Sequence, residues 1–149
     1  DIKLAAFVMW DLDNLKLIND TFGHEYGDRY LKAAADVLKR LHGPKGIVAR
    51  MSGDEFQTFV YGYDTKEEIR AVVEKTHDKM LSTHIGLITG DQIAVRATAG
   101  LAWYPGDSRS YRELLTFSDF AMYMAKAGGK GDISEFDQQD YRKRFRFKS

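Results

Sequence analysis

The stretch Leu-Ala-Ala-Phe-Val-Met-Trp-Asp-Leu-Asp, residues 4–13, decides the fold class of this chain. Residues 4–10 are all apolar, which is typical of a central strand buried on both faces, and the run is too short to favour a buried helix. Asp11 and Asp13 follow directly, where such a strand would end. The sequence therefore predicts a central strand with two carboxylates at its end.

The elements that follow this strand are indicated by apolar spacing and by turn residues. Apolar residues recur at helical spacing over residues 28–41, and a His-Gly-Pro stretch then stops the helix. Before that helix, the polar residues 11–28 are expected to form an ordered loop or a short helical turn. Residues 47–51 and 56–61 are rich in β-forming residues and flank the tetrad Ser-Gly-Asp-Glu, residues 52–55, which predicts a hairpin.

The second half of the chain predicts two more helices and two more strands. Thr65 with Glu68 three residues later is a capping-box pattern, which opens a helix to about residue 82. A long strand is expected over residues 92–103, a helix over residues 111–127 and an edge strand over residues 133–136. The order β-α-β-β-α-β-α-β indicates an α+β fold, in which helices pack on a mixed sheet with an antiparallel central hairpin.

Length and charge exclude several classes of protein. The chain has 149 residues, which predicts one domain, here residues 1–136, and a basic, mobile C-terminal tail over residues 137–149. It carries 22 Lys and Arg against 22 Asp and Glu, so no overall charge attracts it to nucleic acid or to a membrane. We therefore expect neither as a partner, and any charged site must be local.

The absence of cysteine excludes disulfides, a thiol nucleophile and a cysteine-ligated zinc site, and it suits a reducing compartment. The longest apolar run is much shorter than the roughly 20 residues that span a bilayer. We expect a cytoplasmic location, either free or as the cytoplasmic part of a membrane-anchored protein. Because the chain opens at Asp1 and passes at once into a strand, we also expect it to be a fragment of a longer polypeptide.

Carboxylates gather at two turns of the predicted sheet. Asp11 and Asp13 follow the first strand, while Asp54 and Glu55 lie at the hairpin tip. In a βαββ unit the first strand lies beside the hairpin strands, so these side chains are expected to converge. Such oxygen ligands suit Mg²⁺ or Mn²⁺. The alternative is that turns are simply rich in Asp and Gly.

Four separated motifs resemble those of one known family. Residues 11–28 read Asp-Leu-Asp-Asn-Leu-Lys-Leu-Ile-Asn-Asp-Thr-Phe-Gly-His-Glu-Tyr-Gly-Asp, and residues 50–56 read Arg-Met-Ser-Gly-Asp-Glu-Phe. Together with residues 97–101 and 118–130, they resemble in order the motifs of the GGDEF domain, the diguanylate cyclase family. The resemblance covers residues 4–136. It implies a palm-like fold, related to the nucleotide cyclases and close to the ferredoxin-like arrangement. It also implies a homodimer that condenses two GTP into cyclic di-GMP and releases pyrophosphate.

The resemblance also implies the residues that hold the metal and perform the chemistry. Asp11 and Asp54, with the backbone carbonyl of Leu12, are expected to bind Mg²⁺ or Mn²⁺. Asp54 is also the expected acceptor of the 3′-hydroxyl proton, with Glu55 beside it and Lys16 over the phosphates. For Asp13 two roles stay open, a metal contact or a brace for the loop.

The remaining expected residues contact the nucleotide. Backbone amides around Asn14 and Leu15 are expected to face the β- and γ-phosphates. Guanine is expected to be read by Asn19 and Asp28, whose side chains can accept from its N1–H and N2–H₂ donors. The other expected nucleotide contacts are Gly53 in the hairpin turn, His24, which either lines the pocket or braces the loop, and the phosphate-binding lysines Lys126 and Lys130. His42, His77 and His84 show no metal-ligand pattern.

The chain departs from the family's pattern at several positions. Ser52 replaces the first glycine of the naming motif, and Lys130 stands where the family usually has arginine. Gly43 and Gly46 occupy the positions of the family's product-inhibition site, so we expect no inhibition through it. The family's segment before the first strand is also missing, as in a fragment that was cut away from a sensor or regulatory domain.

Two alternatives remain open at this stage. A silent GGDEF domain would bind GTP for regulation or serve as a dimerisation surface, without turnover. A ferredoxin-like nucleic-acid-binding module fits the order of elements, but such modules carry aromatic and basic residues on the sheet. Here the turns carry acids, which repel phosphate unless a metal lies between.

Overall fold

The computed structural model describes residues 1–128 and 132–146, apart from the side chain of Leu41. A five-stranded sheet in the order β2-β3-β1-β6-β7 forms its centre. The strands are β1 (Ala5–Leu12), β2 (Gly46–Ser52), β3 (Glu55–Tyr61), β6 (Ala97–Tyr104) and β7 (Ile133–Glu135). β1 pairs antiparallel with both β3 and β6, and β7 lies parallel to β6 at one edge. The predicted α+β fold with a mixed sheet is confirmed.

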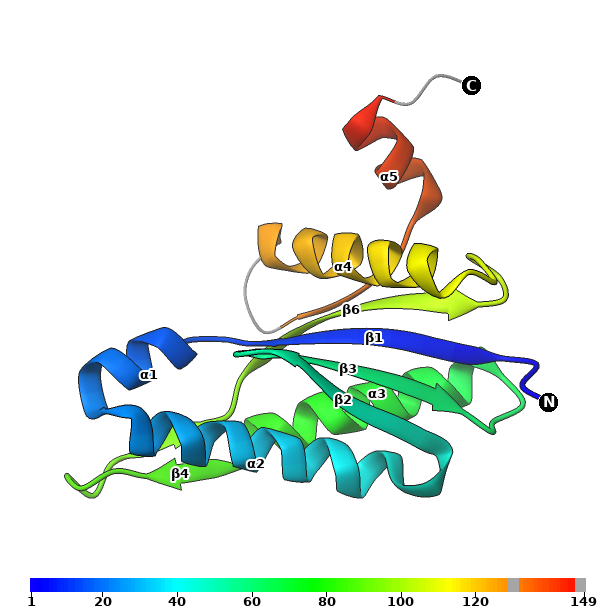
Figure 1. Cartoon of the computed structure of the whole chain (residues 1–149). Coiled ribbons are helices and arrows are strands. Elements are labelled where there is room, and N and C mark those ends of the chain that lie inside the picture. Colours follow the sequence, from blue (N-terminus) through cyan, green and yellow to red (C-terminus); the bar gives the residue numbers. More distant parts are fainter. Residues whose placement is uncertain (129–131, 147–149) are drawn as a thin grey trace.

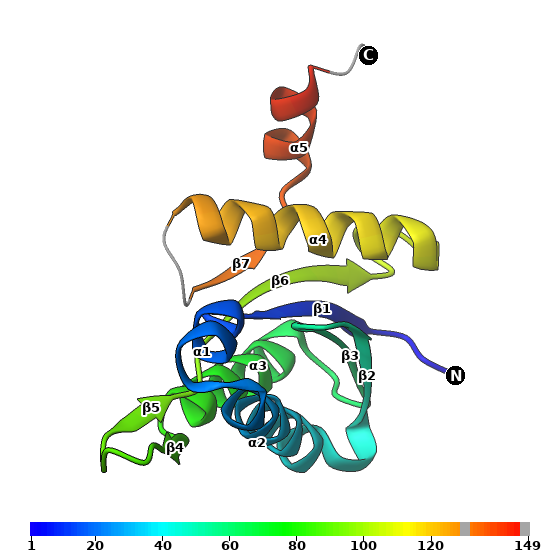
Figure 2. The ribbon, with the colours of Figure 1, turned by 60° about the vertical axis from the view of Figure 1, so that its left-hand side comes forward.

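Helices cover both faces of this sheet. They are α1 (Leu15–Phe22), α2 (His24–His42), α3 (Lys66–Leu81), α4 (Tyr111–Ala127) and α5 (Gln138–Phe145), with a 3₁₀ turn, η1, at Gly43–Lys45. α2 and α3 lie on one face and α4 on the other (Figure 1). α5 projects away from α4 and from the sheet (Figure 2). None of the described helices is long and apolar enough to cross a bilayer.

Strand β1 is buried along its whole length, as its apolar run predicts. Its side chains alternate between two cores because successive residues of a strand point to opposite faces. Val8 and Trp10 lie in the core under α2 and α3, whereas Phe7 lies in the core under α4. On the α4 side, a methyl group at Gly100 would come within 2.1 Å of the Met122 backbone nitrogen. The backbone of α4 therefore lies directly on β6.

Several predicted elements are confirmed. The hairpin of β2 and β3 has its tight turn at Gly53–Asp54, and the third predicted helix appears as α4. Thr65 caps α3, since its side chain accepts from the Glu68 backbone N–H while the Glu68 carboxylate accepts from the Thr65 N–H. The last edge strand appears as β7.

The long strand predicted over residues 92–103 is wrong. Residues 92–94 form β5 (Gln92–Ala94), which pairs with β4 (His84–Gly86) in a separate ribbon, and β6 starts only at Ala97. The sheet has no place for the earlier residues, because its neighbouring strand β1 ends at Leu12, opposite Ala97. Strand β4 has no counterpart among the predicted elements.

Two other segments differ from the predicted elements. Residues 11–28, expected as a loop or one helical turn, include the helix α1 and the start of α2, which meet at Gly23 with a φ of 100°. At the basic end of the chain, residues 138–145 form the helix α5, which no local pattern predicted, and none of its residues is buried. Its Tyr141 ring packs against Phe117, Phe120 and Phe136 at centroid distances of 5.2–5.5 Å.

Candidate functional site

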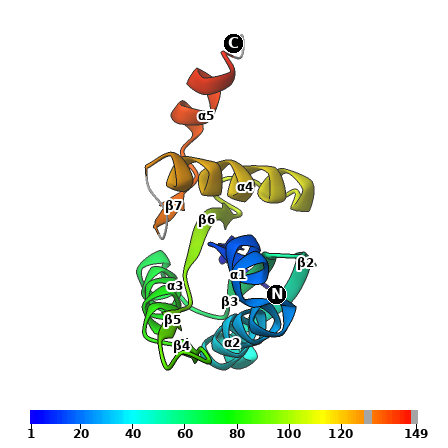
Figure 3. The same cartoon turned by 90° about the vertical axis from the view of Figure 1, so that its left-hand side faces the viewer.

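A polar cleft of about 420 Å³ lies where β1 leads into α1. Figure 3 views the molecule from this end. The cleft is lined by Asp11, Leu12, Asp13, Asn14, Leu15, Lys16, Leu17, Asp20, Asp54 and Lys126. Three separate parts of the chain contribute: the end of β1 with the start of α1, the turn between β2 and β3, and the last turn of α4.

Pairing of β1 with β3 brings the carboxylates of the two turns together. Asp11 lies opposite Glu55 in the register of the two strands. One residue further along, the Leu12 N–H donates to the Asp54 carbonyl at 2.8 Å. The convergence expected from a βαββ unit is therefore present in the structure.

Asp11 is a buried carboxylate with one oxygen in use and one without a partner. The side chain of Lys126 donates to its Oδ2. Its Oδ1 is buried and has no hydrogen-bond partner among the described residues. Burial raises the pKa of the Asp11 carboxyl, and the charges of Asp54 and Glu55 raise it further, against the lowering effect of Lys126. An additional positive charge would therefore stabilise this group.

These residues fit a divalent cation. The unpartnered Asp11 Oδ1 is a hard oxygen ligand, and Asp54 and Glu55 add negative charge around it. No group of three or more His, Cys, Asp or Glu placed to hold a metal occurs within residues 1–128 and 132–146. Mg²⁺ commonly binds through one or two carboxylates and takes its remaining ligands from water and substrate phosphates. The donor set here suits that mode.

Asp13 lines the cleft and makes the contacts of a brace, one of the two roles left open for it. Both of its carboxylate oxygens accept from the Thr98 hydroxyl at 3.1 Å, and only 4% of the residue is exposed. Its backbone N–H donates to the Arg96 carbonyl at 2.9 Å. Asp13 therefore ties the turn after β1 to the start of β6.

The turn after Asp13 leads into α1 through a left-handed residue. Asn14 has a φ of 67°, and its side chain makes no capping bond to the helix. The first N–H groups of α1 thus keep their hydrogen-bonding capacity at the edge of the cleft. The Lys16 side chain is 90% exposed and lies 3.6 Å from the Asp20 carboxylate, so it is a flexible charge rather than a fixed one.

The expected guanine-reading residues lie outside this cleft. Asp28 lines a second cavity of about 470 Å³ between α2 and β2. The Asn19 side chain lies directly against Gly27, because a methyl group there would come within 1.7 Å of Asn19 Oδ1. His24 is exposed at the first position of α2 and lines neither cavity.

Two other expected residues, Glu55 and Gly53, are held by hydrogen bonds within the hairpin turn, and a third is not among the residues that the structure describes. The Glu55 carboxylate accepts from the Ser52 hydroxyl at 3.0 Å. The Gly53 carbonyl accepts from the Arg50 guanidinium at 2.9 Å. Lys130 lies outside the described residues.

Sequence reasoning missed three residues around the site. Arg50 also donates to the Ser52 carbonyl, and thus closes the hairpin turn. Thr98 holds Asp13, and the Tyr30 hydroxyl donates to the Asp13 carbonyl at 2.8 Å. Helical spacing with Ala34, Val37 and Leu38 could have placed Tyr30 in the core. No local pattern names the partner of its hydroxyl.

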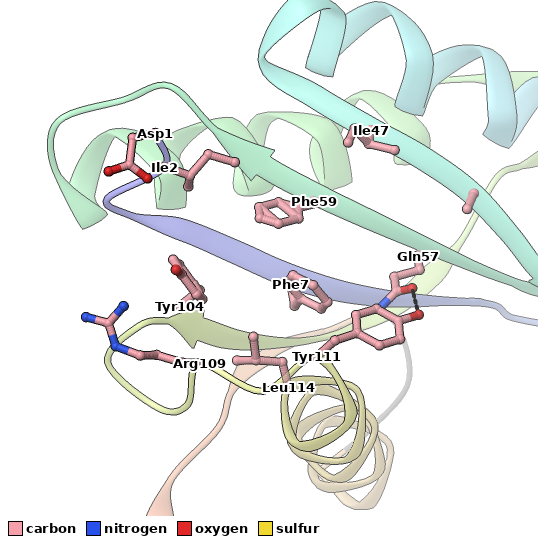
Figure 4. Close-up of a pocket in the computed structure, with 11 residues that line it drawn as sticks. Asp1, Ile2, Phe7, Ile47, Gln57, Phe59, Tyr104, Arg109, Tyr111 and Leu114 are labelled. Carbon is pink, nitrogen blue, oxygen red and sulfur yellow. Dashed lines mark hydrogen bonds between the residues drawn. The ribbon is translucent and has the colours of Figure 1, made fainter.

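A larger cavity, of about 750 Å³, lies elsewhere and differs in chemistry (Figure 4). Phe7, Phe59 and Leu114 form its apolar floor, and its polar lining includes the bonded pair Gln57 and Tyr111 at 3.1 Å. The charged residues at its rim are Asp1 and Arg109, of opposite sign. This lining does not suit a metal-bound triphosphate.

Comparisons with known proteins agree with this geometry. The family model described as "Diguanylate cyclase, GGDEF domain" matches residues 2–132. The bifunctional diguanylate cyclase/cyclic di-GMP phosphodiesterase MucR of Pseudomonas aeruginosa is 29% identical over 137 residues, which are 92% of this chain and 20% of MucR. The probable diguanylate cyclase DgcC of Escherichia coli is 32% identical over 131 residues, which are 85% of this chain and 33% of DgcC.

A solved structure shows the same fold. The GGDEF domain of YfiN, also called TpbB, from Pseudomonas aeruginosa superposes with a TM-score of 0.88 at 28% identity, over 96% of this chain and 83% of that one. The chain spans between a fifth and a third of MucR and DgcC. The family match and the shared fold lead to one conclusion: this chain belongs to the GGDEF domain family of diguanylate cyclases.

Proposed function

We propose that this domain condenses two GTP into cyclic di-GMP with release of two pyrophosphates, in a reaction that needs Mg²⁺ or Mn²⁺. The observation that carries the proposal is the unpartnered, buried Oδ1 of Asp11, in a cleft shared with Asp54 and Lys126. If the ion pair of Asp11 with Lys126 were only structural, it would not need the second carboxylate, Asp54, in the same cleft. A cation with its bound triphosphate would use all three groups.

The metal would be held by Asp11, Asp54 and the Leu12 carbonyl. When bound, it supplies positive charge to the attacking and leaving oxygens of a phosphoryl transfer. Lys126, which neutralises Asp11 in the free protein, is placed to interact with the triphosphate once a cation takes over that carboxylate. Lys16 and Lys130 are proposed to add positive charge over the phosphates.

In the proposed reaction, the 3′-hydroxyl oxygen of one GTP forms a bond to the α-phosphorus of the other. The bond from that phosphorus to the β-phosphate oxygen breaks, and pyrophosphate leaves. Asp54 takes the hydroxyl proton, and Glu55 supports it from the next position. The amides at Asn14 and Leu15 would bind the β- and γ-phosphates.

Guanine would be bound by Asn19 and Asp28, with His24 and Gly53 at the edges of the nucleotide. The carboxylate accepts from N1–H and N2–H₂, a donor pair that adenine lacks. Since the product consists of two identical halves, two sites related by a twofold axis must face each other, and we propose a homodimer. The domain is proposed to work within a longer signalling protein that carries a sensor or regulatory part.

The direct test is to incubate the protein with GTP and Mg²⁺ or Mn²⁺ at high protein concentration. One cyclic di-GMP and two pyrophosphates are expected for every two GTP consumed. Asp54→Asn should reduce turnover at least a hundredfold because it removes both a metal ligand and the proton acceptor. The matched control is Asp78→Asn, a substitution at an exposed position on α3, which should not change turnover.

The outcome also separates the alternatives. GTP binding without product, in both the wild type and the control, would favour a silent GTP-binding domain and contradict the proposed reaction. A shift of RNA mobility that is sensitive to salt and independent of divalent cations would favour a nucleic-acid-binding module instead.

A further inference from the structure

The hydroxyl of Tyr30 joins helix α2 to the ends of two neighbouring strands. Only 1% of Tyr30 is exposed. Its hydroxyl donates to the Asp13 carbonyl at 2.8 Å and lies 3.2 Å from the Arg96 carbonyl, while it accepts from the Arg96 backbone N–H at 2.9 Å. A single side-chain atom thus contacts the backbone after β1 and the backbone before β6.

The position of this hydroxyl explains why the β1–β6 ladder ends where it does. The last paired residues are Leu12 and Ala97. At the next position, Asp13 still donates directly to the Arg96 carbonyl at 2.9 Å. In a regular ladder the Arg96 N–H would donate back to the Asp13 carbonyl. Here the Tyr30 hydroxyl lies between these two groups: it accepts from the Arg96 N–H and donates to the Asp13 carbonyl. The inserted oxygen separates the strands and lets the chain leave β1 at Asn14.

All polar groups of Asp13 are therefore occupied. Its carboxylate accepts from the Thr98 hydroxyl, its N–H donates to the Arg96 carbonyl, and its carbonyl accepts from the Tyr30 hydroxyl. Burial raises the pKa of the Tyr30 hydroxyl, so it remains a proton donor at neutral pH. The next residue, Asn14, adopts a left-handed conformation, which is less favourable for Asn than for Gly and is helped by a fixed preceding residue. The fixed Asp13 is that support.

We propose that Tyr30 is a positioning residue for the phosphate-binding turn, residues 13–17, and couples it to the guanine-reading end of α2. Tyr30 lies two residues after Asp28 on the same helix, so a shift of α2 on base binding would reach the turn through one hydroxyl. This inference rests on the proposed function for its consequence. Its structural part, the control of the turn by Tyr30, can be measured without nucleotide.

The test is Tyr30→Phe, which keeps the ring and removes the hydroxyl. In the nucleotide-free protein, amide hydrogen exchange of Asp13 and Ile18, whose N–H groups donate to the Arg96 and Asn14 carbonyls, should become about tenfold faster, in line with the loss of a buried hydrogen bond worth about 1–1.5 kcal/mol. The Kd of a non-hydrolysable GTP analogue with Mg²⁺ should rise about tenfold, since only a fraction of molecules keeps the competent turn. The Kd of GMP, which lacks the β- and γ-phosphates, should change less than twofold.

Thr76→Val is the matched control, because it also removes one fully buried hydroxyl, bonded to the Val72 carbonyl within α3 at 2.7 Å. It should leave exchange of the Asp13 and Ile18 amides and both affinities unchanged. Thr98→Val removes the hydroxyl that donates to the Asp13 carboxylate, so it should change exchange and affinities in the same way as Tyr30→Phe. It replaces Tyr30→Phe in the test if that variant does not fold.

The results distinguish failure of this inference from failure of the proposed function. Equal exchange changes in Tyr30→Phe and Thr76→Val would overturn the positioning role, as would an equal loss of affinity for GMP and for the GTP analogue. If the wild type binds no GTP analogue, the proposed function fails. In that case faster exchange of the Asp13 and Ile18 amides would still support control of the turn by Tyr30, and its absence would refute it.

Discussion

Two aspartates separated by one residue show how environment assigns a role to a side chain. Asp11 keeps one buried oxygen without a partner and shares its other oxygen with Lys126. Asp13 has both oxygens on Thr98. The first carboxylate keeps an oxygen with no protein partner in the described part of the chain, while the second shares one hydroxyl proton between its two oxygens. At this scale the decisive quantity is the number of free lone pairs on a buried group, not the type of residue.

Replacing Lys126 should change the titration of Asp11. In Lys126→Met the Asp11 carboxylate loses its ion pair with Lys126, so its pKa should rise further above the ordinary value of 3.8. Carboxyl NMR titration of the metal-free protein would measure this. Lys75→Met, an exposed position on α3, is the control and should leave the Asp11 titration unchanged. An unchanged pKa in Lys126→Met would mean that the ion pair does not form in solution.

His42 should make stability depend on pH. It is 2% exposed, and neither ring nitrogen has a hydrogen-bond partner among the described residues. Burial lowers the pKa of His42 below 6.5, so between this lowered native pKa and 6.5 the unfolded chain binds more protons than the native protein. The free energy of unfolding should therefore fall as the pH decreases through about 6.5, by at most about 1.4 kcal/mol per pH unit.

Urea unfolding at several pH values between about 7.5 and about 5 would measure this dependence, because this range brackets the pKa of an ordinary histidine. His42→Leu should flatten the curve in that range, because the group that titrates is gone. The exposed His84 provides the control, and His84→Leu should keep the slope of the wild type.

At the scale of elements, the site depends on close contacts between helices and strands. α1 and α2 meet at Gly23, and the Asn19 side chain of α1 lies against Gly27 of α2. On the other face, Gly100 allows α4 to lie directly on β6, which sets where Lys126 reaches Asp11. Small residues at these contacts therefore place polar side chains that lie far apart in the sequence.

Gly27→Ala should disturb base recognition more than stability. The new methyl group would meet Asn19 Oδ1 at 1.7 Å and force that side chain to move. Alanine is favoured over glycine in a helix by about 1 kcal/mol, which offsets part of the strain. We expect the preference for a GTP analogue over an ATP analogue to fall about tenfold, measured by titration calorimetry, with a change in Tm of only a few degrees. An unchanged preference would contradict base reading by Asn19.

At the scale of the whole molecule, one polar cluster joins helix α3 to the edge strand β7. Arg70 on α3 donates to the Glu135 carboxylate of the edge strand β7 at 2.5 and 3.0 Å, and the Trp103 indole donates to it at 2.9 Å. Burial alone would raise the pKa of Glu135, but these hydrogen bonds outweigh it and lower the pKa. β7 is a three-residue strand with one neighbour, so this cluster is a substantial part of its attachment.

Glu135→Gln should lower the free energy of unfolding by about 1 kcal/mol, the scale of a half-exposed ion pair. The stabilisation by Glu135 should be present above its unfolded pKa and be lost as the pH falls through its lowered native pKa. Glu67→Gln is the control, because Glu67 lies 3.8 Å from the same arginine but is 80% exposed. Denaturant unfolding would compare them, and an equal effect of both substitutions would argue against the bidentate contact.

Local patterns in the sequence predicted the elements whose signals are local. The apolar run of β1, the turn tetrad between β2 and β3 and the capping box of Thr65 depend on neighbours within a few residues, and all three are present in the structure. The long strand over residues 92–103 failed because its break depends on where β1 ends. The C-terminal helix α5 was missed because its Tyr141 packs on aromatic residues of α4 and on Phe136.

Apolar periodicity and turn residues in the sequence indicated the fold class, and four motifs in order indicated the family and the residue types around the candidate site. Only the tertiary structure decided which aspartate keeps a free oxygen, how Lys126 is paired and what the Tyr30 hydroxyl holds. Hydrogen bonds between residues 17 to 115 positions apart decide these points, and they form only when distant elements pack together.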